Sequence, residues 1–342
     1  MTNMMNLDRL LRPRSVAIIG ASDKPGALGA SVLANLERQG FAGAIHLVNP
    51  KRTEIGGRPC VASVDDLPEG VDAAILAIPR VGVLDAIRGL ARRGAGAAVI
   101  FSAGFAEDGP QGLADQEEIA RIAREAGMVV EGPNCLGLVN FCDNVSLTFI
   151  DMPPARAQGD RRVGIVSQSG AMAAVLATTM IHRDVPLNCY ISTGNYLAYL
   201  VDQPDTAVIG MIAEHIRDAA RFLAAARAAR AAGKQVVLLH PGRSAAGAAS
   251  AATHTGAMAG DHAVMAVHVE RAGVILVDSL EELGDAVEIL ARNAAIGTGG
   301  TGVIAESGAF KAMMLDLSEA VGLDLPVLSD ADSPALRAAL PD

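Results

Sequence analysis

The stretch SVAIIGASDKPGALG, residues 15–29, joins a short apolar run to a glycine-rich turn and the start of a helical segment. Ser15–Ile19 is predicted to be a buried strand, and Ala30–Gln39 is predicted to be the helix that follows it. Glycines in such a turn permit positive φ and a close backbone approach to a ligand. The free N–H groups at the start of the helix attract an anion. The stretch therefore predicts a phosphate-binding turn between a strand and a helix.

Apolar runs and amphipathic segments keep alternating along the rest of the chain, which predicts βαβ units and parallel sheets. We expect a Rossmann-like domain over residues 1–150, a flavodoxin-like domain over 160–292 and part of a third α/β unit over 300–342. The Pro-rich Met152–Gly159 is predicted to link the first two. In the third unit, Gly302–Ala305 is predicted as a strand and Phe310–Val321 as a helix, with another strand opening at Val327. The further predicted strands are Ala44–Val48, Ala73–Ile78, Ala97–Phe101, Met128–Glu131, Val163–Ser167, Cys189–Ser192, Val208–Ala213, Gln235–Leu239 and Val274–Val277.

Composition supports helices packed on buried parallel sheets and limits the function. Of 342 residues, 51% are hydrophobic and 19% charged, as expected of strands buried on both faces. The net charge of −10 argues against a nucleic-acid surface, which needs clustered Lys and Arg. No run approaches the roughly 18 apolar residues of a membrane span, and the N-terminus lacks a signal-peptide pattern. We expect a cytoplasmic protein with no membrane or nucleic-acid partner. Cys60, Cys135, Cys142 and Cys189 show no metal-ligand spacing and are predicted to be unpaired thiols, with no metal site.

The second strand narrows the choice of phosphate ligand. A nicotinamide-cofactor site places Asp or Glu at the end of that strand, to bind the ribose hydroxyls. Here Ala44–Val48 is followed by Asn49, Pro50, Lys51 and Arg52, which offer two cations and no carboxylate. This suits an extra phosphate, as in NADP or in the 3′-phosphate of CoA. An ordinary turn with solvated Lys and Arg is the alternative.

Longer motifs resemble one enzyme family over essentially the whole chain. RPRSVAIIGASDKPGALGASVLANL, HLVNPK, AAILAIP, VIFSAGFAE and EGPNCLGLVN resemble the CoA-binding domain of the nucleoside-diphosphate-forming acyl-CoA synthetases. These are relatives of succinyl-CoA synthetase and of ADP-forming acetyl-CoA synthetase. GIVSQSGAMAAVL, LLHPGRSAAGAASAATHTGAMAGD and RAGVILVDSLEEL resemble the ligase-core domain of the same family. The motifs are specific because they occur together and in this order.

The resemblance implies an acid–thiol ligase that forms acyl-CoA from a carboxylic acid, CoA and ATP through an acyl phosphate. In the family a histidine carries the phosphoryl group, and here it matches His254. An imidazole nitrogen is a good nucleophile near neutral pH. Its other ring nitrogen needs an acceptor, and the partner glutamate matches Glu214. His215, His262 and His268 fit no motif and are expected to be structural or surface residues.

The resemblance also implies two sets of binding residues. The phosphate in transit is expected at two predicted helix starts, formed by Ser167, Gln168, Ser169, Gly170, Thr255 and Gly256. CoA is expected to contact Gly20, Ala21, Ser22, Lys24, Gly26, Asn49, Lys51, Ile78, Pro79, Ser102, Ala103, Gly104 and Asn134. Cys135, next to this last residue, is expected to be a packed thiol rather than a nucleophile.

The family's ATP-grasp domain is absent from these residues. ATP or ADP with Mg is therefore expected on a β-type subunit or on a missing C-terminal domain, in an oligomer that acts on a small carboxylic acid. Three positions depart from the family: the acidic loop after Asn195 is missing, His240 replaces a Lys, and Glu306 and Phe310 alter a phosphate-facing turn. These departures motivate an alternative, a CoA- or acyl-CoA-binding protein without ligase turnover. An NADP-dependent oxidoreductase is a third possibility, supported only by the first βαβ unit.

Overall fold

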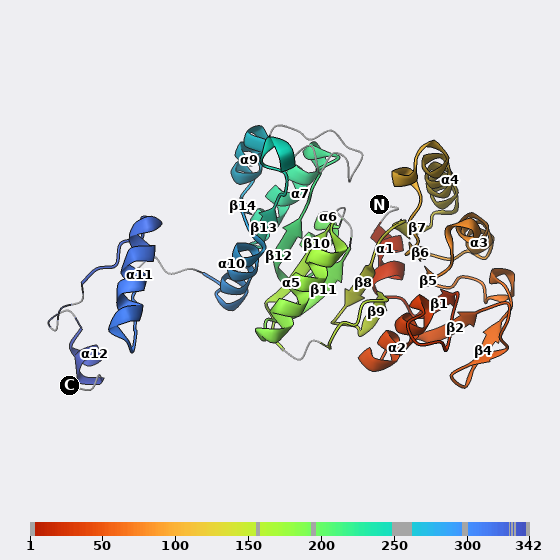
Figure 1. The fold of residues 1–342 in the computed structure, drawn as a ribbon, viewed down its shortest axis with the longest axis horizontal. Helices are drawn as coiled ribbons and strands as arrows, with labels where there is room; N and C mark the ends of the chain where they lie inside the picture. Colours follow the sequence, from red (N-terminus) through yellow and green to blue (C-terminus); the bar gives the residue numbers. More distant parts are fainter. Residues whose placement is uncertain are drawn as a thin grey trace. The chain divides into compact units, whose positions relative to one another are not determined.

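The computed structural model describes residues 4–154, 158–192, 196–247, 262–295, 300–327, 329, 331 and 333–339. The chain divides into a unit of Met1–Ala294, which contains two seven-stranded sheets, and a unit of Ala295–Asp342 (Figure 1). No helix in the described ranges is long and apolar enough to cross a membrane.

The first sheet has the strand order β3-β4-β2-β1-β5-β6-β7, and its neighbours are parallel except for the β3–β4 hairpin. The chain moves outward from β1 on one side and then returns to its other side at β5. This reversal opens a crevice at the carboxyl ends of β1, β2 and β5, where ligands of such sheets bind. The strands are β1 (Ser15–Ile19), β2 (Ala44–Val48), β3 (Glu54–Ile55), β4 (Arg58–Val61), β5 (Ala73–Leu76), β6 (Ala97–Ile100) and β7 (Val129–Glu131), and the helices are α1 (Met4–Leu11), α2 (Leu28–Gln39), α3 (Val83–Arg92) and α4 (Pro110–Ala126).

The second sheet has the order β14-β13-β12-β10-β11-β8-β9, with a parallel part from β14 to β11. Its edge is an antiparallel hairpin, β8–β9, which precedes the rest of the sheet in the sequence. The strands are β8 (Gly137–Asn140), β9 (Val145–Thr148), β10 (Arg162–Ser167), β11 (Leu187–Ile191), β12 (Thr206–Ile212), β13 (Gln235–Leu239) and β14 (Val274–Val277). The helices are α5 (Gly170–His182), α6 (Leu197–Asp202), α7 (Ala219–Ala231), α9 (His262–Arg271) and α10 (Leu280–Arg292).

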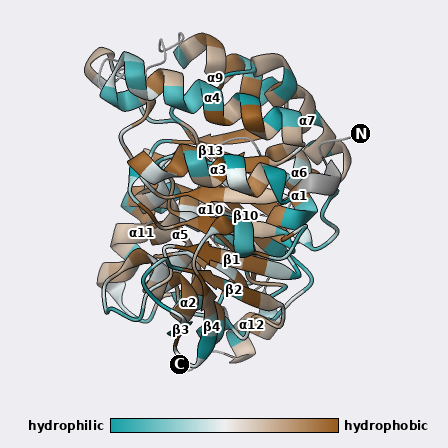
Figure 2. Ribbon diagram, turned by 90° about the vertical axis from the view of Figure 1, so that its right-hand side faces the viewer, coloured by the Kyte–Doolittle hydropathy of each residue, from teal (hydrophilic) through white to brown (hydrophobic). Residues whose placement is uncertain are grey.

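The two sheets share a hydrophobic core. One cluster of buried residues runs from Val16 of β1 through Leu138 of β8 to Val166 of β10. Two buried asparagines add hydrogen bonds across it. Asn35 donates to the carbonyls of Thr148 and Ile150, and Asn140 donates to the carbonyl of Leu11. Coloured by hydropathy, the strands are brown and the helices carry teal on their outer sides, as expected of sheets covered by amphipathic helices (Figure 2).

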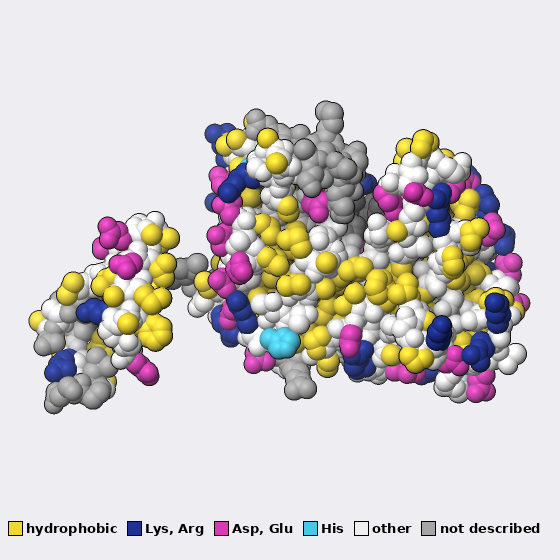
Figure 3. All heavy atoms as spheres, in the orientation of Figure 1, with side chains coloured by type: hydrophobic (Ala, Val, Ile, Leu, Met, Phe, Trp, Pro, Cys, Tyr) yellow, Lys and Arg dark blue, Asp and Glu magenta, His cyan; other side chains and the backbone are white. Residues whose placement is uncertain are grey.

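The unit of residues 295–342 contains α11 (Gly308–Ala320) and α12 (Pro334–Ala339). The predicted helix is confirmed, but the predicted strand at Gly302–Ala305 is wrong, because the described residues there form no strand. Much of the strand predicted to open at Val327 lies outside the described residues. A strand needs a neighbour to complete its hydrogen bonds, and none of the described residues provides one. Helix α11 exposes apolar side chains, including Phe310 at 63% and Leu317 at 57% (Figure 3).

Candidate active site

The turn after β1 approaches the neighbouring strand so closely that it needs glycine. Gly20 has φ of 87°, and a Cβ there would overlap the carbonyl oxygen of Ala77, just after β5. A Cβ on Gly29 would overlap the carbonyl oxygen of Gly20. Helix α2 therefore packs its first turn directly on the loop, and its free N–H groups lie beside the glycine cradle.

The end of β2 is tied to this turn through Asn49. Its side-chain amide donates to the carbonyl of Ala21 at 2.7 Å, and its side-chain oxygen accepts from the N–H of Lys51 at 2.8 Å. The side chains of Lys24, in the turn after β1, and of Lys51, after β2, are both exposed. The neighbouring Arg52 forms an ion pair of 3.0 Å with Asp23. The loop thus presents cations and backbone donors without a carboxylate at the end of β2, which fits a phosphorylated nucleotide with an additional phosphate.

A cavity of about 350 Å³ lies beside the turn. It is lined by Gly20, Pro50, Val64, Ile78 and Ala86, among others, so two of the predicted CoA residues border it. Apolar residues make up much of its lining, which suits a planar base, and Asp65, Asp85 and Arg92 complete it. The residues present therefore fit CoA, which would supply a thiol for acyl transfer.

The remaining predicted CoA residues follow the ends of β5, β6 and β7. The loop after β6 meets the loop after β7, because the N–H of Asn134 donates to the carbonyl of Ser102 at 3.1 Å. Asn134 has φ of 55° and is exposed, whereas the adjoining Cys135 is buried. The burial of Cys135 agrees with the packed thiol expected from the sequence, and it raises the pKa of that thiol.

The loop after β10 forms the predicted phosphate-binding turn at the start of α5. Ser167 is fully buried, and its hydroxyl accepts from the N–H of Ser169 at 3.0 Å and donates to the Ser169 carbonyl at 2.7 Å. Helix α5 begins at Gly170, and no side chain caps its N-terminus. Its first N–H groups are therefore available to an anion.

Gln168 connects this turn to the end of β12. Its side-chain oxygen accepts from the N–H of Glu214 at 2.7 Å and from that of His215 at 2.9 Å. Its amide nitrogen donates to the carbonyl of His215 at 2.6 Å. Three hydrogen bonds thus fix the predicted phosphate turn relative to the half-buried Glu214.

The CoA-side loop and the phosphate turn also meet. A Cβ on Gly170 would overlap the side chain of Leu136 and lie 2.8 Å from the hydroxyl of Ser192. That hydroxyl accepts from the N–H of Leu136 at 3.3 Å. The structure therefore brings the segment around Asn134 to the start of α5, although more than thirty residues separate them in the sequence.

The remaining predicted residues, His254, Thr255 and Gly256, lie outside the described residues. On either side of that range, the rings of His240 and His262 are 5.5 Å apart in an edge-on arrangement. Burial lowers the pKa of His240, and His262 and His215 lower it further, whereas Glu214 opposes the shift. His215 and His262, expected to be structural or surface residues, thus lie close to the candidate site. For His215 the position just after the end of β12 could have indicated this from the sequence, whereas His262 begins α9 and offered no such signal.

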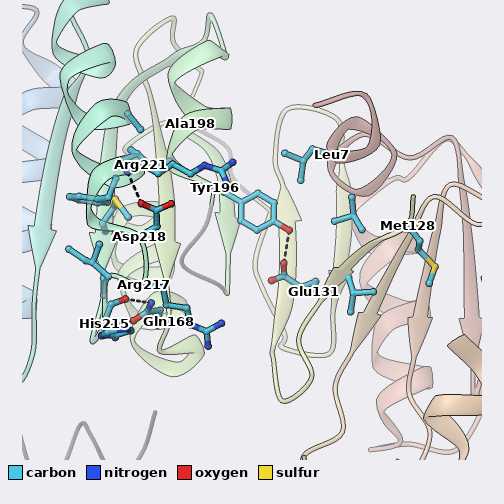
Figure 4. A pocket seen from close by; sticks show the side chains of 18 residues that line it. Leu7, Met128, Glu131, Gln168, Tyr196, Ala198, His215, Arg217, Asp218 and Arg221 are labelled. Carbon is cyan, nitrogen blue, oxygen red and sulfur yellow. Dashed lines mark hydrogen bonds between the residues drawn. The ribbon is translucent and has the colours of Figure 1, made fainter. Parts of the chain in front are cut away.

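Sequence reasoning also missed a buried pair of polar side chains. Glu131, at the end of β7, is 1% exposed, and its carboxylate accepts a hydrogen bond of 2.8 Å from the hydroxyl of Tyr196 (Figure 4). Burial raises the pKa of Glu131 to about 7. The sequence did offer one indication that Glu131 is functional, since its carboxylate lies at the end of a predicted strand. A position at a strand end also supported the choice of Glu214.

Comparison with known proteins agrees with this geometry. A family model described as "CoA binding domain" matches residues 14–140, and one described as "succinyl-CoA ligase like flavodoxin domain" matches residues 160–290. The alpha subunit of ADP-forming acetate–CoA ligase I from Pyrococcus furiosus is 31% identical over 94% of this chain and 71% of its own length. The chain belongs to the nucleoside-diphosphate-forming acyl-CoA synthetase family.

Two further relatives extend the comparison. A trans-feruloyl-CoA synthase from an unknown prokaryotic organism is 53% identical over 98% of this chain and 49% of its own length. A solved structure of acetyl-coenzyme A synthetase 1 from Ca. Korarchaeum cryptofilum, in complex with phosphate and ADP, has a TM-score of 0.86 at 28% identity. It covers 100% of this chain and 74% of its own. The chain spans about half the length of the curated relatives with which it shares most identity.

Proposed function

We propose that this chain is the CoA-binding, α-type portion of an acid–thiol ligase that forms acyl-CoA and a nucleoside diphosphate. The observation that carries the proposal is the meeting of three loops at one place. The segment around Asn134, the turn of Ser167–Gly170 and the residue Glu214 are joined through Leu136 and Gln168. In this proposal residues 1–150 bind CoA, residues 160–292 carry the phosphohistidine loop, and residues 300–342 begin a third ligase-like unit.

The chemistry assigned to these residues is phosphoryl and acyl transfer. A carboxylate oxygen of the acid attacks the phosphorus of phosphorylated His254, the N–P bond breaks, and an acyl phosphate forms. The CoA sulfur then attacks the acyl carbon, phosphate leaves, and the thiol proton goes to phosphate. Glu214 accepts a hydrogen bond from the other nitrogen of the His254 ring and stabilises the charge that develops there. The N–H groups at Gly170 stabilise the phosphate in transit.

Regeneration of the phosphohistidine requires a nucleotide site. We place ATP or ADP with Mg on an ATP-grasp subunit or domain, in a cytoplasmic oligomer. The names of the relatives support this, since two of them are alpha subunits of ADP-forming ligases. Among acids to test, hydroxycinnamic acids come first, because the 53% identical relative is a trans-feruloyl-CoA synthase.

The test uses the reverse half-reaction, which needs no partner. The chain is incubated with feruloyl-CoA or acetyl-CoA and labelled inorganic phosphate. The expected product is an acid-labile, base-stable phosphate on the protein. His254→Ala abolishes it, Glu214→Gln reduces it, and His268→Ala, on the exposed end of α9, serves as the matched control. Full labelling of His254→Ala would contradict the assignment.

One observation favours a second function. The sequence holds only five residues between Ile191 of β11 and Leu197 of α6, whereas the family resemblance implies a longer acidic loop at this place. A CoA- or acyl-CoA-binding protein without turnover would bind CoA in calorimetry and yet show no phosphohistidine. It would remain unlabelled with acyl-CoA and phosphate, and also with ATP and an ATP-grasp partner.

A further inference from the structure

A second cavity lies between the end of the first sheet and the helices α6 and α7 of the second. Its volume is about 480 Å³, within the range of small-molecule sites. Both sides contribute apolar lining residues, among them Met128 and Val130 on one side and Leu197, Ile216 and Phe222 on the other. An acetyl group would leave most of these walls uncovered. Arg217, Asp218 and Arg221 also line the cavity, so it suits a larger body that carries polar groups as well as an apolar part.

One side of this cavity adjoins the candidate active site. Gln168 and His215 line it, and Gln168 is the side chain that joins the phosphate turn to Glu214. A carboxylic acid with its carboxyl group near Gln168 would therefore extend its remaining atoms between the apolar walls, away from the phosphate turn.

The cavity also has a buried polar wall, formed by Glu131 and Tyr196. One carboxylate oxygen of Glu131 accepts from the Tyr196 hydroxyl. The other, Oε1, is buried and has no hydrogen-bond partner among the residues that the structure describes. An unsatisfied buried acceptor is costly and rare in folded proteins. A ligand hydroxyl at this wall would remove that cost.

We propose that this cavity is the acyl pocket, and that Oε1 of Glu131 accepts a hydrogen bond from a hydroxyl group at the far end of an aromatic acid. The substrate class is thus an aryl acid with a phenolic hydroxyl distant from its carboxyl group. Glu131 acts as a specificity residue, and Tyr196 holds its carboxylate in place. The proposal rests on the proposed function for the identity of the site, but the binding geometry can be measured without turnover.

The test is calorimetric titration of the chain at about pH 8, above the pKa of about 7 of Glu131, with 4-hydroxycinnamic acid and with cinnamic acid, which lacks only the hydroxyl. The wild-type protein is expected to bind the hydroxylated acid at least about tenfold more tightly. In Glu131→Leu the ratio of the two affinities falls to about one. Glu131→Gln preserves the shape of the side chain and keeps one carbonyl oxygen as an acceptor, so its ratio is expected to lie between those of the wild type and Glu131→Leu. Glu117→Gln, on the exposed side of α4, keeps the wild-type ratio.

Equal affinities of the wild-type protein for the two acids, or an unchanged ratio in Glu131→Leu, would overturn the proposal. The result of this binding experiment can be told apart from the result of the phosphohistidine labelling that tests the proposed function. A protein that binds the acids selectively but never forms phosphohistidine retains the pocket and loses the ligase assignment. If His254 is labelled but the two acids bind equally well, the ligase assignment stands and the proposed role of Glu131 in specificity does not.

Discussion

Gln168 holds Glu214 through the backbone, with its side-chain oxygen 2.7 Å from the N–H of Glu214. The same amide makes two further hydrogen bonds to His215. A side chain from the phosphate turn thus fixes the backbone of the residue whose carboxylate is proposed to orient His254, and the two residues are 46 apart in the sequence.

Gln168→Ala is expected to slow phosphohistidine formation by roughly 10- to 100-fold, because Glu214 loses its fixed position. CoA affinity stays unchanged, since the loops around Gly20 and Asn49 are separate from this contact. The measurement is the labelling rate from acyl-CoA and phosphate, together with calorimetry of CoA. Gln111→Ala on the exposed face of α4 is the matched control, and an equal loss in both variants would contradict the role of Gln168.

Gly20→Ala is expected to abolish CoA binding and to lower the melting temperature. Its φ of 87° disfavours alanine, and the added Cβ would overlap the carbonyl oxygen of Ala77. Gly57 has φ of 76° with nothing within 4 Å of its Cβ position. Gly57→Ala therefore reports the strain alone, about 1 kcal/mol. Thermal unfolding and CoA titration of both variants test whether the overlap adds a larger loss at Gly20.

Lys51→Ala is expected to weaken CoA binding roughly 3- to 10-fold, as for a partly screened contact between an exposed cation and a phosphate. Its effect on dephospho-CoA, which lacks the 3′-phosphate, should be much smaller. Calorimetry of both ligands measures the difference, with Lys311→Ala as the control. Equal losses for the two ligands would place Lys51 elsewhere on the cofactor.

Glu131 is expected to make the stability of the protein depend on pH. Its pKa is about 7 in the folded chain, against an ordinary value of 4.5. Between these values the folded state keeps a proton that the unfolded state has released, so the free energy of unfolding falls as the pH rises. The loss attributable to Glu131 is of order 3 kcal/mol and is complete above about pH 7.

Urea unfolding at pH 5 and pH 8 measures this dependence. Glu131→Gln, which cannot ionise, should lose less stability than the wild-type protein over that interval. Glu117→Gln should behave as the wild type does. Identical pH dependence in all three proteins would show that the Glu131 carboxyl titrates normally.

Much of the fold follows from local patterns. The predicted strands Ser15–Ile19, Ala44–Val48, Gln235–Leu239 and Val274–Val277 agree with β1, β2, β13 and β14 to the residue, because each is a short apolar run bounded by turn residues. The predicted turn after β1 could also be located, since glycine spacing and the residues that follow β2 are properties of the sequence itself.

Contacts between distant segments could not be predicted in the same way. Nothing local shows that Tyr196 would meet Glu131, or that His262 would lie against His240, because such pairs depend on how the sheets are connected. The predicted strand at Gly302–Ala305 failed for a related reason. Its residues favour a strand, but pairing requires a neighbour, which local preference does not supply. Whether His254 and its neighbours act as proposed stays a prediction.

The hairpin β8–β9 restricts how this chain can be divided. Gly137–Thr148 precedes the second set of βαβ units in the sequence, yet it completes the edge of their sheet beside β11. A fragment that ends near residue 150 would carry this hairpin away from its own sheet and leave β11 as an exposed, apolar edge open to aggregation. Recombination or protein engineering that aims to exchange the CoA-binding half should therefore cut between Glu131 and Gly137, even though that short segment passes through the candidate active site.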